Sequence, residues 1–251
     1  MTPAAEAPRS EGVRLRLSAL RALALALVAV AASAWLLRPA LSLGAAYPAT
    51  AVGIAALGAW AVMAYLPGRH PYPQFGAANA VTLARGVITA LVGALIVTPT
   101  TVGVAAFATV AGTVAAVLDG VDGRLARGRG VASEFGARFD MEVDALLVLA
   151  LAALAWRWDR AGAWVLLSGL LRYAFVAAGW LAPWLRRPLP PRRRRQAVCV
   201  AQVAVLLAVV APLLPPGASA PLAFAGLLAL ASSFALDVTW LAGQARDPLD
   251  R

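Results

Sequence analysis

The sequence predicts an all-α integral membrane protein with about eight transmembrane helices. Three observations support this fold class. The chain is 61% hydrophobic and only 14% charged, with a mean hydropathy of +0.77. Its apolar residues form long runs, each close to the roughly 20 residues that cross the hydrocarbon core of a bilayer. Its arginines gather in alternate segments between these runs, as expected of a chain that crosses a membrane repeatedly.

The expected spans, in chain order, are residues 17–37, 46–66, 79–99, 102–118, 138–157, 162–183, 196–214 and 220–243. The first run has the apolar character of a signal peptide. No small-residue cleavage site precedes Arg38, and an equally apolar second run follows, so we predict a retained helix. Turn residues such as Pro67-Gly68 and Pro215-Pro216-Gly217 separate the runs.

Arginine placement predicts the orientation of the chain, because cytoplasmic loops carry an excess of basic residues. Counting the spans alternately puts both termini in the cytoplasm and leaves only Arg38, Arg157 and Arg160 outside. The net charge of +10 is then explained by topology and by contact with anionic lipid. We therefore expect membrane lipids as partners and no nucleic acid.

The single cysteine and the single histidine exclude several kinds of site. Cys199 has no second cysteine for an intramolecular disulfide. His70 argues against zinc sites built on two or three histidines. It also lies in a proline-rich stretch with no evident catalytic partner for a Ser-His-Asp triad.

Four aspartates within residues 119–144 form the candidate site. Asp119 and Asp122 are three residues apart, and Asp140 and Asp144 are four apart, so each pair shares a face of its helix. Carboxylates at a bilayer edge are costly without a partner, and hard divalent cations prefer oxygen ligands. The spacing predicts a carboxylate site for one or two cations that handles a phosphate-bearing substrate at the cytoplasmic face.

The same residues carry a family resemblance. The pattern D-x2-D-G-x2-A-R-x8-G-x3-D-x3-D is matched here in every residue and spacing, and it resembles that of the CDP-alcohol phosphotransferase (CDP-alcohol phosphatidyltransferase) family. A second stretch, Asn79-x-x-Thr82-x-x-Arg85, is similar to the opening of that family's first core helix. The resemblance implies a six-helix core plus two additional N-terminal helices. The expected divisions are a cytoplasmic tail 1–16, additional helices 17–70, the core 71–244 and a cytoplasmic tail 245–251.

The resemblance also implies a reaction. A small alcohol attacks a CDP-linked donor, expected to be CDP-diacylglycerol, and CMP leaves. Asp119, Asp122, Asp140 and Asp144 are expected to hold Mg²⁺ or Mn²⁺, two ions in all, with Asp144 as the general base. The residues expected to bind the nucleotide and diphosphate are Asn79, Thr82, Arg85, Gly123, Ala126 and Arg127.

The acceptor is expected to be a small polar alcohol, phosphorylated or not. Arginine binds phosphate through its two-pronged guanidinium, so arginines at the cytoplasmic mouth are candidate acceptor ligands. They are Arg138, Arg172, Arg192, Arg193, Arg194 and Arg195. The competing interpretation is that the run from Arg192 only sets topology. Asp237 is expected to pair with an arginine.

Other functions remain open on the sequence. A transferase can instead use a soluble CDP-alcohol and a lipid acceptor. A cation-coupled transporter would place acids near the midplane, whereas these lie at span ends. An inactive scaffold would tolerate loss of motif residues, and all are present. A homodimer is left open, and the expected location is a cell membrane, the inner membrane in a bacterium.

Overall fold

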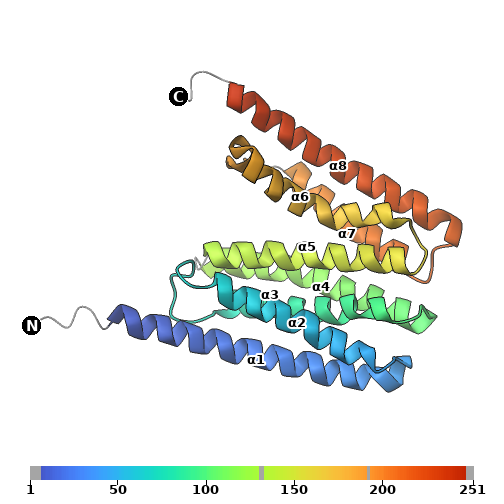
Figure 1. Ribbon diagram of the computed structural model, residues 1–251, viewed down its shortest axis with the longest axis horizontal. Coiled ribbons are helices and arrows are strands. Elements are labelled where there is room, and N and C mark those ends of the chain that lie inside the picture. Colours follow the sequence, from blue (N-terminus) through green and yellow to red (C-terminus); the bar gives the residue numbers. More distant parts are fainter. Residues whose placement is uncertain (1–6, 130–132, 191–192, 247–251) are drawn as a thin grey trace, which may run out of the picture. The chain divides into compact units, whose positions relative to one another are not determined.

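The computed structural model describes residues 7–129, 133–190 and 193–246, although the side chains of residues 7–11, 121–129, 216 and 246 lie outside this description. All regular structure in the described ranges is helical, in agreement with the predicted all-α class (Figure 1). The α-helices are α1 (Ala7–Leu41), α2 (Ala46–Tyr65), α3 (Ala77–Gly93), α4 (Val102–Arg129), α5 (Glu134–Arg157), α6 (Leu167–Leu181), α7 (Arg193–Val210) and α8 (Pro216–Arg246). Short 3₁₀ turns are η1 (Ala94–Val97), η2 (Ala163–Leu166) and η3 (Pro183–Arg186).

Six helical segments in the described residues are long and apolar enough to cross a membrane, so the chain is a multi-pass membrane protein. The predicted spans 138–157 and 196–214 correspond to α5 and α7, which are not among the six. Composition explains the difference. The first half of α5 carries five charged side chains, and α7 begins with three arginines. The crossing of the membrane by α5 and α7 therefore stays a prediction.

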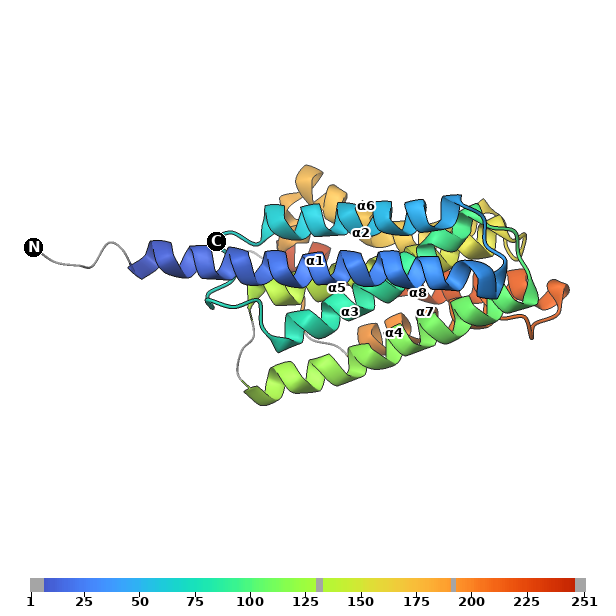
Figure 2. The same ribbon diagram turned by 90° about the horizontal axis from the view of Figure 1, so that it is seen from below.

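The chain separates into two compact units, residues 1–147 and 148–251, with α5 continuing through the boundary. In the first unit, α1 packs along α2, and α3 packs on α4 and against α1 (Figure 2). Thr101 helps to start α4, because its hydroxyl accepts a 3.2 Å hydrogen bond from the backbone N–H of Val104. The hydroxyl of Tyr47 on α2 donates to the carbonyl oxygen of Leu91 on α3 at 3.1 Å.

One apolar core of the first unit draws on distant parts of the sequence. Its buried members are Leu15, Ala19, Leu23, Val62, Leu66, Phe75 and Phe135. They come from α1, α2, the segment between α2 and α3, and the first turn of α5. The predicted additional helices 17–70 therefore share a core with the start of an aspartate-bearing helix. The predicted division of the chain at residue 70 stays a prediction.

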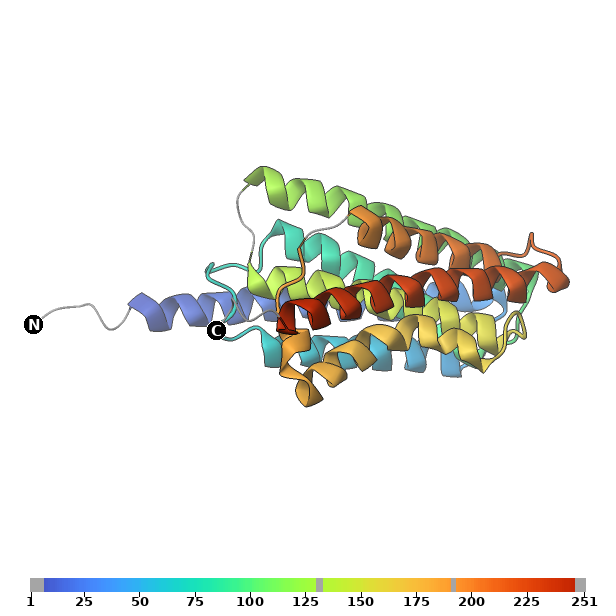
Figure 3. The same ribbon diagram turned by 90° about the horizontal axis from the view of Figure 1, so that it is seen from above.

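The second unit is built on α6, α7 and α8, with α7 packed along α8 (Figure 3). Gln202 of α7 donates a 3.0 Å hydrogen bond to the hydroxyl of Ser168 on α6. Arg194 of α7 contacts Asp237 of α8 at 2.7 Å, and the Asp237 side chain is only 8% exposed. The expectation that Asp237 pairs with an arginine is confirmed.

Candidate metal centre

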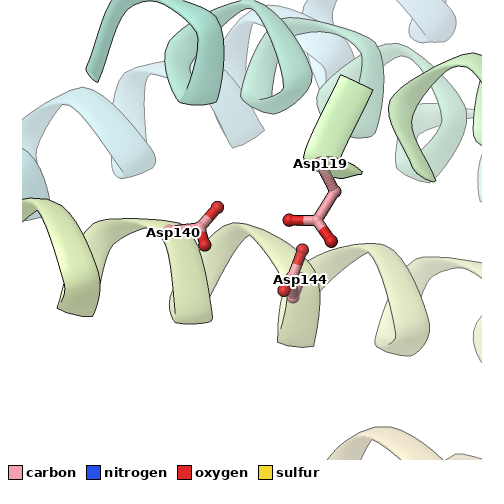
Figure 4. Close-up of side chains that lie close together, drawn as sticks. All are labelled: Asp119, Asp140 and Asp144. Carbon is pink, nitrogen blue, oxygen red and sulfur yellow. The ribbon is translucent and has the colours of Figure 1, made fainter. Parts of the chain in front are cut away.

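Three of the four predicted aspartates converge in the first unit. Asp119 lies near the end of the apolar part of α4, and Asp140 and Asp144 lie one turn apart on α5 (Figure 4). One carboxylate oxygen from each lies within 4.8 Å of the others. Residues four apart on a helix face the same side, so Asp140 and Asp144 of α5 can both lie close to Asp119 of α4. The aspartates are partly buried, with side chains 41%, 38% and 45% exposed in chain order.

The remaining pattern residues of α4 follow Asp119 along the helix. Asp122, Gly123, Ala126 and Arg127 belong to α4, but their side chains lie outside the described part of the chain. Their expected roles, a fourth carboxylate and contacts to the nucleotide and diphosphate, therefore stay predictions.

Arg85 lies at the centre of the three aspartates. Its Nη1 is 2.9 Å from Oδ1 of Asp119 and 2.5 Å from Oδ1 of Asp140, and its Nη2 donates to Oδ1 of Asp144. Its Nε donates to the carbonyl oxygen of Ala115 at 3.1 Å. The Arg85 side chain is 1% exposed, so its charge depends on these partners. Arg85 was expected at the diphosphate, and in the structure it joins α3 to both aspartate-bearing helices.

The donor set fits a hard divalent cation. Every candidate ligand atom is a carboxylate oxygen, the type that Mg²⁺ prefers. Three carboxylates opposed by one guanidinium leave net negative charge in the cluster. Each carboxylate also keeps an accessible portion that Arg85 does not cover. The site therefore has the chemistry to hold a metal ion.

The other two α3 residues of the second motif, Asn79 and Thr82, are also buried. The Asn79 amide donates a 2.5 Å hydrogen bond to the carbonyl oxygen of Phe75, and the Thr82 hydroxyl donates to that of Ala78 at 3.2 Å. Gly136 of α5 lies directly against Asn79, since a Cβ at Gly136 would be 2.9 Å from Asn79 Oδ1. The glycine of the aspartate pattern thus permits close approach of α3 and α5.

The candidate acceptor arginines are divided between the two units. Arg138 forms an ion pair with Glu142 on α5 at 2.9 Å. Arg172, Arg193, Arg194 and Arg195 belong to the second unit, where Asp237 contacts Arg194 at 2.7 Å and Arg195 at 3.7 Å. Arg192 lies outside the described residues. Arg138, Arg194 and Arg195 each therefore have an acidic partner within their own unit, and the acceptor role of the whole group stays a prediction.

Sequence reasoning missed two polar residues at the start of α5. The Ser133 hydroxyl accepts a 2.9 Å hydrogen bond from the backbone N–H of Gly136, which makes Ser133 the N-cap. His70 Nδ1 lies 3.0 Å from the same hydroxyl. A serine followed by an acidic first turn is a recognisable cap signal, but no local pattern indicates the histidine partner.

Comparison with known proteins adds the family. A model of the CDP-alcohol phosphatidyltransferase family matches residues 75–238, more than half of the chain. The matched range contains all four predicted aspartates together with Asn79, Thr82 and Arg85. Neither the curated proteins nor the solved structures gave a match.

Proposed function

The chain belongs to the CDP-alcohol phosphatidyltransferase family, an enzyme family of phospholipid synthesis, and we propose that it transfers a phosphatidyl group from CDP-diacylglycerol to a small polar alcohol. The observation that carries this proposal is the convergence of Asp119, Asp140 and Asp144 within a membrane protein. The products are a phospholipid and CMP. In the proposed orientation, eight spans place both termini and the aspartates at the cytoplasmic face, where CMP is released.

Asp119, Asp122, Asp140 and Asp144 are the proposed ligands for two Mg²⁺ or Mn²⁺ ions. When bound, these cations supply counter-charge to the donor diphosphate and to the departing phosphate. The described carboxylates suit this role because their oxygens already share one small region. Arg85 reduces their mutual repulsion and holds α3 against α4 and α5 through direct contacts.

Asp144 is the proposed general base. The acceptor hydroxyl oxygen forms a bond to the phosphatidyl phosphorus, and the bond from that phosphorus to the CMP oxygen breaks. The hydroxyl proton passes to the Asp144 carboxylate, which requires a base within hydrogen-bond reach of the acceptor. The Asp144 side chain is 45% exposed, so an acceptor can approach it, and its contact with Arg85 orients the carboxylate.

The proposed donor pocket combines α3 and the end of α4. Asn79, Thr82 and Arg85 of α3 are assigned to it, together with Gly123, Ala126 and Arg127, which are assigned to the nucleotide and diphosphate. Small residues permit close approach of a flat base to the helix backbone. An arginine binds two phosphate oxygens at once.

The proposed acceptor is a phosphorylated small alcohol, which needs positive countercharge because it approaches a diphosphate. Arg138 is the candidate in the first unit, and Arg172 and Arg192 to Arg195 are candidates from the rest of the chain. Arg193 is the first of these arginines to test, because its side chain is exposed while Arg194 and Arg195 contact Asp237.

The decisive experiment measures CMP release by the purified protein in lipid vesicles. CDP-diacylglycerol with glycerol phosphate or inositol phosphate should support release that depends on Mg²⁺ or Mn²⁺. CDP-choline or CDP-ethanolamine with diacylglycerol tests the transferase that uses a soluble donor, and release only from these would overturn the proposed donor.

The matched control is Asp159→Asn, which makes the same chemical change at an exposed turn residue. Asp159 has φ of 56°, a conformation that asparagine also tolerates. Asp119→Asn and Asp140→Asn should lose CMP release, whereas Asp159→Asn should retain it. Near-normal release by either site variant would contradict the proposed metal site.

A further inference from the structure

We propose that α1, α2 and the segment joining α2 to α3 position the two site helices α3 and α5, with Phe75 and His70 as the principal positioning residues. We call residues 66–76 the linker. This inference rests on the proposed function, because it concerns the geometry of that site. It assigns a role to the helices that precede the family match at residue 75.

Phe75 connects three helices through three different groups. Its backbone N–H donates a 3.2 Å hydrogen bond to the hydroxyl of Ser18 on α1. Its carbonyl oxygen accepts from the Asn79 amide on α3 at 2.5 Å. Its ring lies 6.0 Å from that of Phe135 and 6.2 Å from that of Phe139, both on α5. A displacement of Phe75 therefore acts on both site helices together.

The ring contacts reach the edge of the metal site. Phe135 and Phe139 stack with centroids 5.7 Å apart, and Phe139 directly precedes Asp140 in the chain. Phe135 is 1% exposed in the core that α1 and α2 supply, and Leu83 of α3 packs against that core. Aromatic pairs of this kind add directional contact to apolar burial. The rotation of α5 that aims Asp140 and Asp144 is thus set by residues of α1, α2 and the linker.

A polar connection holds the first turn of α5 to the linker. His70 Nε2 lies 2.9 Å from the carbonyl oxygen of Gln74, which can only accept, so Nε2 carries a proton. Nδ1 lies 3.0 Å from the Ser133 hydroxyl, and that hydroxyl accepts from the Gly136 N–H at 2.9 Å. In addition, the Phe135 N–H donates to the carbonyl oxygen of Arg69 at 3.2 Å.

The close packing of α3 on α5 connects the position of these helices to the geometry of the metal site. Gly136 and Asn79 are so close that a Cβ at Gly136 would require the Asn79 side chain or the helices to shift. Arg85 reaches Asp140 and Asp144 only while α3 and α5 keep this separation. Metal ligands tolerate small displacements poorly, and loss of a supporting partner commonly lowers metal affinity about 10- to 100-fold.

The test compares His70→Ala and Phe75→Leu with Tyr47→Phe in the full-length protein. Tyr47→Phe is the matched control, because the hydrogen bond that it removes is at Leu91, at the end of α3 farthest from Asn79 and the linker. Mn²⁺ affinity is measured by electron paramagnetic resonance titration. Hydrogen–deuterium exchange of residues 134–140 and thermal melting are followed in the same preparations.

We expect His70→Ala and Phe75→Leu to lower Mn²⁺ affinity about tenfold and to speed exchange at 134–140, with Tyr47→Phe unchanged in both. The melting temperature of His70→Ala should stay close to that of the native chain, since His70 is only half-buried. If Phe75→Leu does not fold, His70→Ala decides alone.

Native affinity and native exchange in His70→Ala would overturn the positioning role, as would equal effects in Tyr47→Phe. Failure of the native chain to release CMP would count against the proposed function only. Exchange at 134–140 would still show whether the linker holds α5.

Discussion

Nη1 of Arg85 lies 2.5 Å from Oδ1 of Asp140, which joins a fully buried cation on α3 to a carboxylate on α5. The same guanidinium also contacts Asp119 and Asp144. Within the described residues, one arginine thus connects all members of the carboxylate cluster. This relationship makes Arg85 a determinant of site structure as well as a candidate ligand for the diphosphate.

Replacing Arg85 by Gln should destabilise the first unit. The change leaves three adjacent carboxylates without their shared cation. Removing one partner of a buried pair costs about 3–5 kcal/mol, and we expect about 1–3 kcal/mol because the carboxylates are near 40% exposed and partly screened. Thermal melts with a chelator and with excess Mg²⁺ measure this. Mg²⁺ should raise the melting temperature of Arg85→Gln more than that of the native chain. An equal rise in both would contradict the role of Arg85 as the shared counter-charge.

Asp144→Asn should abolish most turnover without preventing folding. Asparagine keeps the size of the side chain but cannot accept the acceptor proton, and a positioned general base commonly contributes about 10²- to 10⁴-fold. CMP release at saturating donor and acceptor measures the loss. Asp159→Asn is again the control for the chemical change, and a loss below tenfold would argue that another group takes the proton.

Gly136→Ala should raise the KM for the CDP-linked donor. The new methyl group would lie 2.9 Å from Asn79 Oδ1 and 3.1 Å from Ser133 Oγ, so α3 and α5 must separate or Asn79 must turn. Overpacking of this kind costs about 1–3 kcal/mol. Gly58→Ala on α2 is the control, because a Cβ there meets no atom within 4 Å. Steady-state kinetics and thermal melting compare Gly136→Ala with Gly58→Ala. Equal donor KM values and equal melting temperatures in the two variants would contradict the role of Gly136 in the close approach of α3 and α5.

Substitutions in the arginine run should separate structural from ligand-binding side chains. Arg194→Gln should lower the free energy of unfolding by about 2 kcal/mol, because it removes a partner of the buried Asp237. This cost is smaller than that expected for a fully buried ion pair, since the Arg194 side chain is 31% exposed. Arg193→Gln should leave stability unchanged and raise the KM of a phosphorylated acceptor, with donor KM constant. The comparison needs melts and kinetics of both variants. Unchanged acceptor KM in Arg193→Gln would remove Arg193 from the acceptor site.

The proposed orientation predicts which side of the membrane the α4–α5 connection faces. In a Cys199→Ser background, which removes the one free thiol, Arg129→Cys should react with an impermeant thiol reagent only from the cytoplasmic side. Inverted vesicles expose the cytoplasmic face to the reagent, and right-side-out vesicles expose the outer face. Labelling of Arg129→Cys from the outer face would refute the orientation.

Several features of the protein follow from the sequence because they are local. Long apolar runs specify membrane helices through length and hydropathy, which yields the all-α class and the multi-pass assignment. Spacings of three and four residues specify shared helix faces, which explains why Asp140 and Asp144 were expected side by side. The same locality limits the prediction at α5 and α7, where charged or polar residues interrupt the runs and leave membrane crossing undecided.

The helices, the aspartate-bearing faces and the family pattern therefore follow from local features of the chain. No local pattern predicts that Arg85 bonds Asp140 and Asp144, 55 and 59 residues away, or that His70 contacts Ser133, 63 residues away. Only the packing of α1 and α2 placed Phe75 and Phe135 in one core. The physical reason is that helical periodicity fixes which residues share a face, whereas partners between helices depend on how those faces pack.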